Sequence, residues 1–542
     1  MSLKKFLQQV CHSKLDNIPF IRQLLYEPST ELFQSINNND DVCSIAQKYT
    51  LLLERYLQYL EQCYNDEAKR ERLAMNVLLS IWKLCQLIYF SEKPYNITDL
   101  MEWQIKTYQP YLWEHDRYSI YASTVNHPDF WPFLYRLALF HQTEQICQLL
   151  SLASSQLYVK DLAPLFTEIQ HVVRQPSQNG FDTVLDNLSR YQDPIANGLS
   201  TLCRLLVGNR RVAAQYASDQ VQAYIVSFYY EHLATKNDGS MPLYADFEET
   251  HNAAEAFLAG NIFQALDFCT QYDGWLLTHL CILFEKKGML DKPLYANLEQ
   301  GETIQMGCLE YFKIVYAACI KNQCGLWKES FIYLLSCGKI GKEAIHEHLK
   351  LLDIEDEHRL KEVADFCIAN DMKEEGLALY EKKATVCFEV QDYRKAIHYY
   401  ELAENQECLD KVLRKIIQDY SATGNLIDVG IRKSYDSAYY KTYNYLLIMN
   451  EHMDNLDYTA AGDKLKELVQ WVDLPQFVLP IIFQEGVKLV ENKECRLDAD
   501  TLLMLKKIWK LLQREEPLDP EFDTFLDTSA ITLSRALDRM TE

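Results

Sequence analysis

The sequence is poor in proline and glycine. It holds 15 Pro and 17 Gly in 542 residues, about 3% each, below the roughly 5% and 7% of average proteins. Because strands, hairpin turns and flexible linkers use these residues and long helices exclude them, the shortage argues against a β-rich chain. The hydrophobic fraction of 48% is ample for a packed core, which argues against intrinsic disorder.

Cysteine pairs and long apolar runs are missing as well. None of the 16 cysteines belongs to a CxxC pair, and most stand among apolar residues as small core fillers. The N-terminus, MSLKKFLQQVCH, has no apolar signal core, and no apolar run approaches the roughly twenty residues of a membrane span. We therefore expect a soluble intracellular chain with unpaired cysteines and no transmembrane segment.

Positive charge is scarce. Lys and Arg number 54 against 77 Asp and Glu, a formal net charge of −23, and no basic run is longer than a pair such as Arg210–Arg211. Proteins that bind phosphate backbones or anionic membranes need clustered cations. We therefore expect no direct binding to nucleic acid.

Motifs of catalytic and cofactor sites are absent: there is no GxGxxG, Walker loop or GxSxG. In His346-Glu347-His348 the histidines are two residues apart and point to different sides of a helix, so we expect solvated helix surface. The acidic cluster Asp353–Glu357 lacks the glycine and ligand spacing of a calcium loop and is expected at a solvated helix start. We predict that the protein is not an enzyme and has no catalytic residue, cofactor or metal site.

A spacing of bulky, small and apolar residues recurs in the second half of the chain. Positions i, i+3 and i+7 share one face of a helix, where the small residue lets a neighbouring helix approach. Such helical hairpins stack into solenoids. The copies, roughly 65 residues apart, are Ile262/Ala265/Cys269, Trp327/Ser330/Leu334, Tyr393/Ala396/Tyr400 and Tyr458/Ala461/Leu465.

Apolar periodicity predicts helices through most of the chain, and no segment shows sustained strand alternation. The pattern breaks near 291–303. We therefore predict an all-α fold, an elongated irregular α-solenoid of helical hairpins. The clearest helical segments are 40–64, 67–91, 181–190, 195–207, 211–233 and the nearly continuous hairpins of 249–420.

Several aromatic segments follow one another in a recognisable order over about residues 18–542. They are Leu79 to Cys85 around Trp82, Phe130-Trp131 with Leu137 to Leu139, Trp275 with His279-Leu280, Leu326-Trp327 to Cys337-Gly338, Asp392-Tyr393 with Ala396 to Tyr400, Tyr443 to Tyr445, Tyr458 to Ala461, Leu474-Pro475 and Ser534 to Leu537. In this order they resemble the outer-ring (Y-complex) nucleoporin family commonly called nucleoporin eighty-five, or seventy-five in some animals.

The resemblance implies an ancestral-coatomer-type solenoid, in which the chain runs up a trunk, folds back through a crown, returns along the trunk and ends in a tail. By analogy the N-terminal trunk spans 1–120, the crown 121–289, the returning trunk 290–425 and the tail module 426–542. It also implies a scaffold of the nuclear pore complex at the nuclear envelope. The absence of any Phe-Gly dipeptide fits a scaffold subunit better than a permeability-barrier subunit.

Two partner contacts are implied in the same way. The tail joins the hub of the Y beside other outer-ring nucleoporins, and we place this contact on an exposed part of the tail near Leu505, Trp509 and Leu512. The alternative is that these three residues are intramolecular core. A Seh-type WD β-propeller binds near the N-terminus, where the candidate contact residues are Leu3, Phe6, Leu7 and Val10.

The N-terminus departs from the family pattern, in which an extension supplies a β-blade to the propeller. A three-stranded blade needs roughly twenty residues or more. Only about 17 residues precede Ile18 here, and their periodicity indicates a helix. Three explanations stay open: the lineage lost the blade, the true start lies upstream of Met1, or the propeller docks differently.

We predict a structural subunit of the pore that supports nucleocytoplasmic transport, mRNA export and pore assembly through protein–protein contacts. One alternative is a vesicle-coat or lysosome-associated scaffold built on the same solenoid and propeller. Another is a cytosolic TPR-like adaptor for peptides. The acidic balance argues against the carboxylate-clamp version of such an adaptor, because that clamp needs basic side chains.

Overall fold

The computed structural model describes residues 22–36, 40–113, 124–155, 162–236, 244–290, 294–297, 303–353, 355–431, 433–471, 474–492, 497–513 and 520–541. The chain divides into two compact units, Met1–Glu347 and His348–Glu542. Both consist almost entirely of helices, which confirms the predicted all-α class. None of the described helices is both long and apolar enough to cross a membrane.

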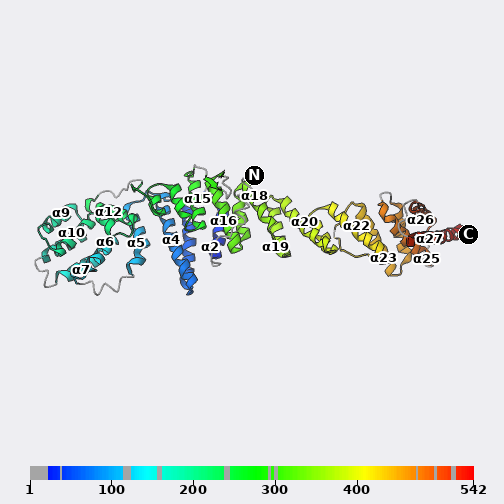
Figure 1. The fold of residues 1–542 in the computed structure, drawn as a ribbon, viewed down its shortest axis with the longest axis horizontal. Helices are drawn as coiled ribbons and strands as arrows, with labels where there is room; N and C mark the ends of the chain where they lie inside the picture. Colours follow the sequence, from blue (N-terminus) through cyan, green and yellow to red (C-terminus); the bar gives the residue numbers. More distant parts are fainter. Residues whose placement is uncertain are drawn as a thin grey trace. The chain divides into compact units, whose positions relative to one another are not determined.

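The first unit folds back on itself. Its first helices, α2 to α5, pack against one another and also against helices much later in the sequence. In these long-range contacts α2 meets α17, α3 meets α15, α4 meets α13 and α15, and α5 meets α12. Figure 1 shows α2 and α4 (blue) beside α15 and α16 (green). The bounds are α2 Gln23–Ser35, α3 Val42–Gln62, α4 Asp66–Tyr89, α5 Ile97–Trp113, α12 Gln220–Thr235, α13 Ala253–Leu258, α14 Ile262–Cys269, α15 Gly274–Lys286, α16 Cys308–Cys324, α17 Trp327–Leu335 and α18 Gly338–Lys350.

Between α5 and α12 the chain makes a cluster of shorter helices. Helix α10 contacts α6, α8, α9, α11 and α12, so these helices close around one apolar core. That core extends from Leu84 in α4 to Leu258 in α13. The bounds are α6 Phe130–Leu139, α7 Thr143–Ser154, α8 Ala163–Arg174, α9 Gln178–Leu188, α10 Pro194–Leu206 and α11 Arg210–Tyr216.

The second unit is a stack in which each helix packs mainly on its neighbours in sequence, from α19 and α20 through to α26 and α27. Contacts limited to adjacent hairpins are what defines a solenoid. The bounds are α19 Glu357–Ala369, α20 Lys373–Glu389, α21 Tyr393–Leu402, α22 Gln406–Thr423, α23 Ala438–Asp454, α24 Tyr458–Gln470, the short 3₁₀ turn η4 Gln476–Val478, α25 Leu479–Glu491, α26 Ala499–Leu512 and α27 Pro520–Thr541.

The recurring bulky–small–apolar spacing marks helix starts. The bulky residue of each copy is the first residue of α14, α17, α21 or α24. The small residues Ala265, Ser330, Ala396 and Ala461 are all fully buried. The small and the later apolar positions are therefore buried in both units as predicted, whereas the bulky residues Ile262, Trp327 and Tyr458 are only half-buried.

One kind of turn precedes all four of these helices. Two residues before each start, the backbone is left-handed, with φ of 77° at Gly260, 71° at Gly325, 63° at Gln391 and 63° at Leu456. Such a residue closes the C-terminus of the preceding helix.

The next residue then serves the following helix. The amide of Asp392 donates to the carbonyl of Cys387 at 2.9 Å, while its carboxylate accepts from the amide of Lys395 at 3.1 Å. A single short turn thus caps the end of one helix and the start of the next.

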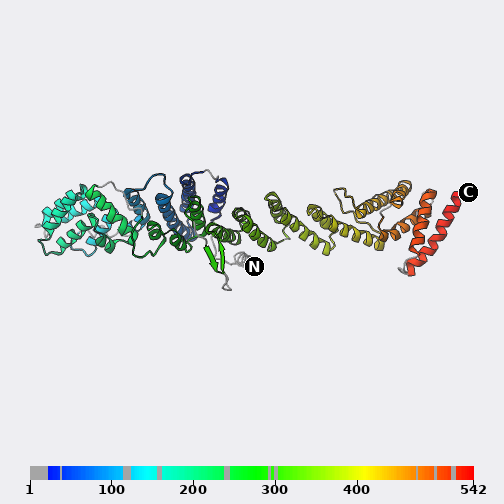
Figure 2. The ribbon, with the colours of Figure 1, turned by 90° about the horizontal axis from the view of Figure 1, so that it is seen from above.

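One sequence prediction was wrong, and one correctly predicted break in the helices contains a feature that the sequence did not reveal. The helix expected at 211–233 is two helices, α11 and α12, because Asp219 accepts from the amide of Gln222 at 2.8 Å and starts a new helix. The break expected at 291–303 contains an antiparallel hairpin, β1 (Leu294–Asn297) with β2 (Thr303–Met306), in which Leu294 pairs with Met306. These strands, the arrows in Figure 2, are too short for their alternation to stand out in a sequence.

Candidate functional site at the junction of α2, α4 and α15

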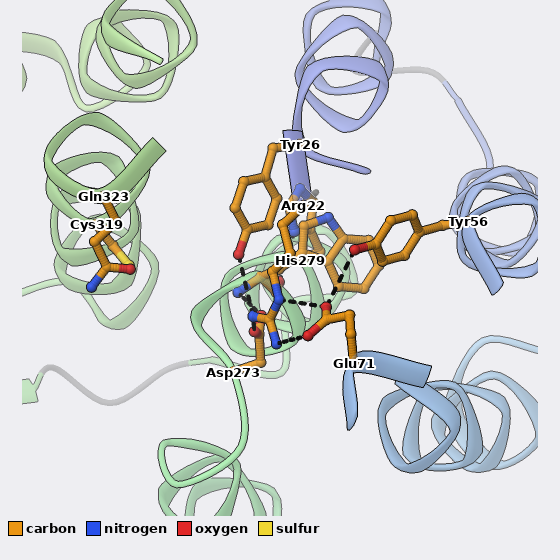
Figure 3. A network of polar contacts seen from close by, with 9 residues as sticks. Arg22, Tyr26, Tyr56, Glu71, Asp273, His279, Cys319 and Gln323 are labelled. Carbon is orange, nitrogen blue, oxygen red and sulfur yellow. Dashed lines mark hydrogen bonds and ion pairs between the residues drawn. The ribbon is translucent and has the colours of Figure 1, made fainter. Parts of the chain in front are cut away.

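Three charged side chains from distant parts of the sequence meet inside the first unit. Arg22 directly precedes α2, Glu71 lies in α4 and Asp273 precedes α15 (Figure 3). Nε of Arg22 donates to Oε1 of Glu71 at 2.6 Å, and Nη2 donates to Oε2 at 3.2 Å. Nη1 forms an ion pair with the carboxylate of Asp273. One guanidinium therefore joins the early helices to a helix 251 residues further along the chain.

Local helix starts hold both carboxylates in place. Asp273 is the N-cap of α15, and its Oδ1 accepts from the amide of Trp275 at 2.6 Å, while Oδ2 faces Arg22. Glu71 lies about one and a half turns into α4, whose start is capped by Asn65 accepting from the amide of Ala68 at 2.6 Å. The positions of the two acids thus follow from where their helices begin.

All three charged residues are buried. The exposed fractions are 9% for Arg22, 4% for Glu71 and 7% for Asp273. Burial opposes the charged guanidinium, but the negative charge of Asp273, together with the hydrogen bond and charge of Glu71, outweighs this effect and raises the pKa of Arg22 above its ordinary value. Removing one member of such a group is costly because it leaves a buried charge without its partner.

Two tyrosines complete the polar shell. Nη1 of Arg22 donates to the hydroxyl of Tyr26 at 3.4 Å, and the hydroxyl of Tyr56 donates to Oε1 of Glu71 at 3.4 Å. Burial, and then the negative charge nearby, raises the pKa of each tyrosine, so both stay neutral donors or acceptors. The single cation Arg22 thus faces two carboxylates, Glu71 and Asp273, and hydrogen bonds supply the remaining stabilisation of their negative charge.

His279, one turn and a half into α15, lies beside this group. Its Nδ1 is 2.7 Å from the carbonyl oxygen of Trp275, which can only accept, so Nδ1 carries the proton. Its Nε2, 2.9 Å from the hydroxyl of Tyr333, is then the acceptor. Burial lowers the pKa of His279 to about 3, and both ring nitrogens are satisfied in the neutral form.

Aromatic rings surround His279. The ring centroid of Tyr49 is 4.7 Å away, that of Trp275 4.6 Å and that of Tyr333 5.9 Å. Trp82 of α4 packs against Trp275 at 5.5 Å. Edge-to-face and tilted contacts of this kind add to the energy of burial. The aromatic cluster therefore binds α3, α4, α15 and α17 into one core.

The side chains of this junction, which we call the clamp, have a structural role: they hold helices together. Arg22 is committed to two carboxylates, and the nitrogens of His279 are committed to Trp275 and Tyr333. These side chains are buried, so none presents a proton donor or acceptor to a substrate in solvent. What the arrangement does is to hold the fold-back of the first unit closed.

Sequence reasoning did not find this junction. Arg22 stands among apolar neighbours, Glu71 lies inside the charged run Lys69–Arg72, and nothing in the sequence relates either of them to Asp273. The only local signal was that of Asp273 as a helix N-cap before the apolar run Trp275–Phe284.

The predicted partner-contact residues lie elsewhere. Leu3, Phe6, Leu7 and Val10 are outside the described residues. In the tail, Leu505 and Leu512 are buried, and the indole N–H of the half-buried Trp509 donates to the carbonyl of Leu526 at 3.1 Å. The two leucines therefore belong to the core of the second unit.

The opposite face of α26 carries a different set of side chains. Leu503 and Leu511 are each 49% exposed, and Lys507 and Lys510 lie between them. We call these four residues the outer face of α26. The sequence analysis had overlooked it, although the four positions share one side of a helix.

The prediction for His346-Glu347-His348 was partly wrong. His346 is exposed, but Glu347 and His348 are buried. The acidic cluster fulfils its prediction: Asp353 to Glu357 are exposed where described, and Asp356 caps α19 by accepting from the amide of Arg359 at 3.0 Å.

One group of possible metal ligands occurs within the described ranges. It consists of Asp41, Cys43 and Glu92 near the start of α3. The carboxylate of Asp41 already caps that helix by accepting from the amide of Ser44 at 3.0 Å. The group lies at the surface and has the character of a helix cap.

Comparison with known proteins adds a sequence relationship. The family model described as Nup85 Nucleoporin matches residues 7–510. A curated protein named Nucleoporin nup85, from Schizosaccharomyces pombe, is 21% identical over 411 residues, which cover 67% of this chain and 60% of that relative. The match thus spans about three fifths of the length of this relative.

Proposed function

The chain belongs to the Nup85 nucleoporin family, whose members are structural subunits of the nuclear pore complex at the nuclear envelope, and on that premise we propose that it is a non-enzymatic scaffold of the outer ring (Y complex). The observation that carries the proposal is the clamp at Arg22. A buried ionic and aromatic junction that closes a fold-back serves to keep a long helical body in one shape. Shape is what a scaffold contributes to an assembly.

We further propose that this scaffold supports nucleocytoplasmic transport, mRNA export and pore assembly through protein–protein contacts. The division into N-terminal trunk 1–120, crown 121–289, returning trunk 290–425 and tail 426–542 remains our proposal for the roles of its parts. The contact of α2 with α17, which joins the proposed N-terminal trunk to the proposed returning trunk, supports the idea of a trunk.

The proposed partners are other Y-complex nucleoporins, met through the tail, and a Seh-type WD β-propeller, met near the N-terminus. The proposed tail lies within the second unit, which is compact by itself, so its outer surfaces can bind a partner without disturbing the fold-back of the first unit. No described side chain carries the propeller contact, which rests on the family resemblance alone.

Affinity purification of the tagged full-length chain from its own cells, followed by mass spectrometry, tests the proposal. We expect outer-ring nucleoporins, and recovery of the propeller with them would support the second contact. Cells that express the tag alone are the control. Recovery of vesicle-coat subunits without nucleoporins would overturn the assignment to the pore.

The finer roles need a cellular readout. Depletion of the protein is expected to weaken the nuclear-rim signal of other outer-ring subunits and to retain polyadenylated RNA in the nucleus, with rescue by the full-length chain. Normal rim assembly and normal RNA export after complete depletion would contradict the proposed roles in assembly and export.

A further inference from the structure

The outer face of α26 is positively charged, although the protein as a whole is acidic. Helix α26 carries Lys506, Lys507 and Lys510 against a single acid, Asp500, whereas the whole chain has a net charge of −23. Lys507 and Lys510 are exposed and form no ion pair with any residue in the part of the chain that the structure describes. Asp500 lies on the same side at the N-terminus of the helix, where an acid is favoured by the helix dipole.

Apolar surface accompanies this charge. Leu503 and Leu511 are half exposed, although the same helix buries Leu502, Leu505 and Leu512 on its other side. Leu505 packs so closely on α25 that a β-carbon at Gly486 would lie 2.7 Å from its Cδ2 atom. The core face of α26 is therefore already filled, and the two outer leucines have no place in it.

We propose that the outer face of α26 (Leu503, Lys507, Lys510 and Leu511) binds an acidic amphipathic helix of a partner protein. The proposal rests on the proposed function for one point, that the tail meets a partner; the charge and the exposed leucines are properties of this chain. A partner with carboxylates around an apolar stripe would neutralise both lysines and cover both leucines.

Helical shape in the partner follows from the geometry of the surface. The four residues lie within nine positions of the helix, about 12 Å along its axis, and form a convex ridge. The backbone of α26 is bonded within the helix and offers no strand edge, so an extended peptide would gain no main-chain pairing. A second helix can pack its own grooves on such a ridge.

An anionic membrane is the less suitable occupant. Amphipathic membrane helices present a broad apolar face and a strongly basic polar face. Here the apolar part consists of two leucines, and the surrounding protein is acidic, which opposes approach to an anionic bilayer.

The test uses the full-length chain and designed probes. The first probe is a fluorescent helical peptide of about twenty residues with a leucine stripe at i, i+3 and i+4 spacing flanked by glutamates; the second has lysines in place of the glutamates. Vesicles of phosphatidylserine and phosphatidylcholine form a third arm. Fluorescence anisotropy and vesicle co-sedimentation are the readouts.

We expect the acidic peptide to bind at least about tenfold more tightly than the basic one, with an affinity that falls as salt is added. The charge reversal Lys507→Glu with Lys510→Glu should invert this preference. The pair Leu503→Ala and Leu511→Ala should weaken the binding of the acidic peptide about tenfold. All four positions are exposed, so circular dichroism should show an unchanged fold.

Matched controls come from α20 of the same unit. Lys382→Glu reverses a charge on an exposed position, and Val390→Ala truncates a side chain that is 70% exposed, directly after that helix. Neither change should alter the binding of the peptides. Equal binding of the acidic and basic peptides, binding of vesicles alone, or no binding in any arm would overturn the proposal.

Failure of this inference can be told apart from failure of the proposed function. Selective binding of the acidic peptide, with no nucleoporins recovered from cells, supports the outer face of α26 as a binding site for an acidic helix. The same result contradicts the assignment of the chain to the outer ring. Recovery of nucleoporins without selective peptide binding supports the assignment to the outer ring and contradicts the proposed binding site on α26.

Discussion

The indole N–H of Trp275 donates a hydrogen bond to the hydroxyl of Ser29 at 2.9 Å, although 246 residues separate the two in sequence. The Ser29 hydroxyl in turn donates a hydrogen bond to the carbonyl oxygen of Leu25 at 2.6 Å. Both residues are buried. Together with the ion pairs of Arg22, this contact gives α2 two separate polar attachments to α15, at its start and near its middle.

Loss of the Arg22 side chain should open this attachment. Arg22→Met leaves Glu71 and Asp273 buried without a cation, and we expect a loss of about 3–5 kcal/mol in the free energy of unfolding of the first unit. Urea denaturation measures the loss, and hydrogen exchange of the peptides from α2 locates it. Combining Arg22→Met with Glu71→Gln and Asp273→Asn removes the unpaired charges and should recover part of the stability.

The exposed Arg190 serves as the matched control. Arg190→Met should change the free energy of unfolding by no more than about 0.5 kcal/mol. If Arg22→Met were equally mild, the junction would not be the clamp that we describe.

The neutral state of His279 makes the first unit sensitive to acid. Because burial lowers its pKa in the folded chain from 6.5 to about 3, only the unfolded chain takes up a proton as pH falls below about 6.5. The stability present above this pH is therefore lost progressively towards pH 3, by up to about 1.4 kcal/mol per pH unit. His279→Gln should flatten this part of the curve of unfolding free energy against pH.

Urea titrations at a series of pH values between 7 and 4 give that slope. His358, whose side chain is 84% exposed, is the control, and His358→Gln should leave the slope as it is. An unchanged slope in His279→Gln would show that His279 is protonated in the folded state.

The left-handed turn residues offer a stabilising change. Gln391 and Leu456 adopt φ of 63°, which costs residues with a β-carbon about 1 kcal/mol relative to glycine. Gln391→Gly and Leu456→Gly should each raise the free energy of unfolding of the second unit by about 0.5–1 kcal/mol. The same substitution in the middle of α20, Lys382→Gly, should lower it by about 1 kcal/mol. If all three substitutions changed the free energy of unfolding in the same direction, the left-handed backbone would not explain the effect.

Gly341 tests the close approach of α18 to α17. A β-carbon at Gly341 would lie 1.6 Å from the carbonyl oxygen of Leu334, a backbone atom that cannot turn aside. Gly341→Ala should therefore lower the melting temperature even though alanine favours helices. In Gly274→Ala the new carbon would meet Tyr316 at an ordinary 3.6 Å, so this change should be neutral or slightly stabilising.

Local patterns in the sequence predicted much of the fold. The small residues of the recurring spacing, such as Ala396 and Ala461, are fully buried as expected, because the helix period places i, i+3 and i+7 on one side whatever the tertiary structure. The helices predicted at 40–64 and 67–91 agree with α3 and α4 to within two residues at each end.

Contacts between distant segments could not be predicted in this way. Arg22 and Asp273 meet only because the chain folds back, and no periodicity relates positions 251 residues apart. Helix α26 shows a second limit of prediction from hydrophobic periodicity. It has leucines on two sides, and periodicity alone does not tell which side faces the core. Leu505 and Leu512 were chosen for their regular spacing, which is the mark of buried residues.

The packing of the second unit, in which helices contact mainly helices one or two places away in sequence, has a mechanical consequence. A pulling force passes through the successive hairpin contacts in turn, and the small extensions of all the contacts add together. The fold-back of the first unit arranges its contacts side by side, so that they share the load. Under the same pulling force, the second unit should therefore extend more than the first unit.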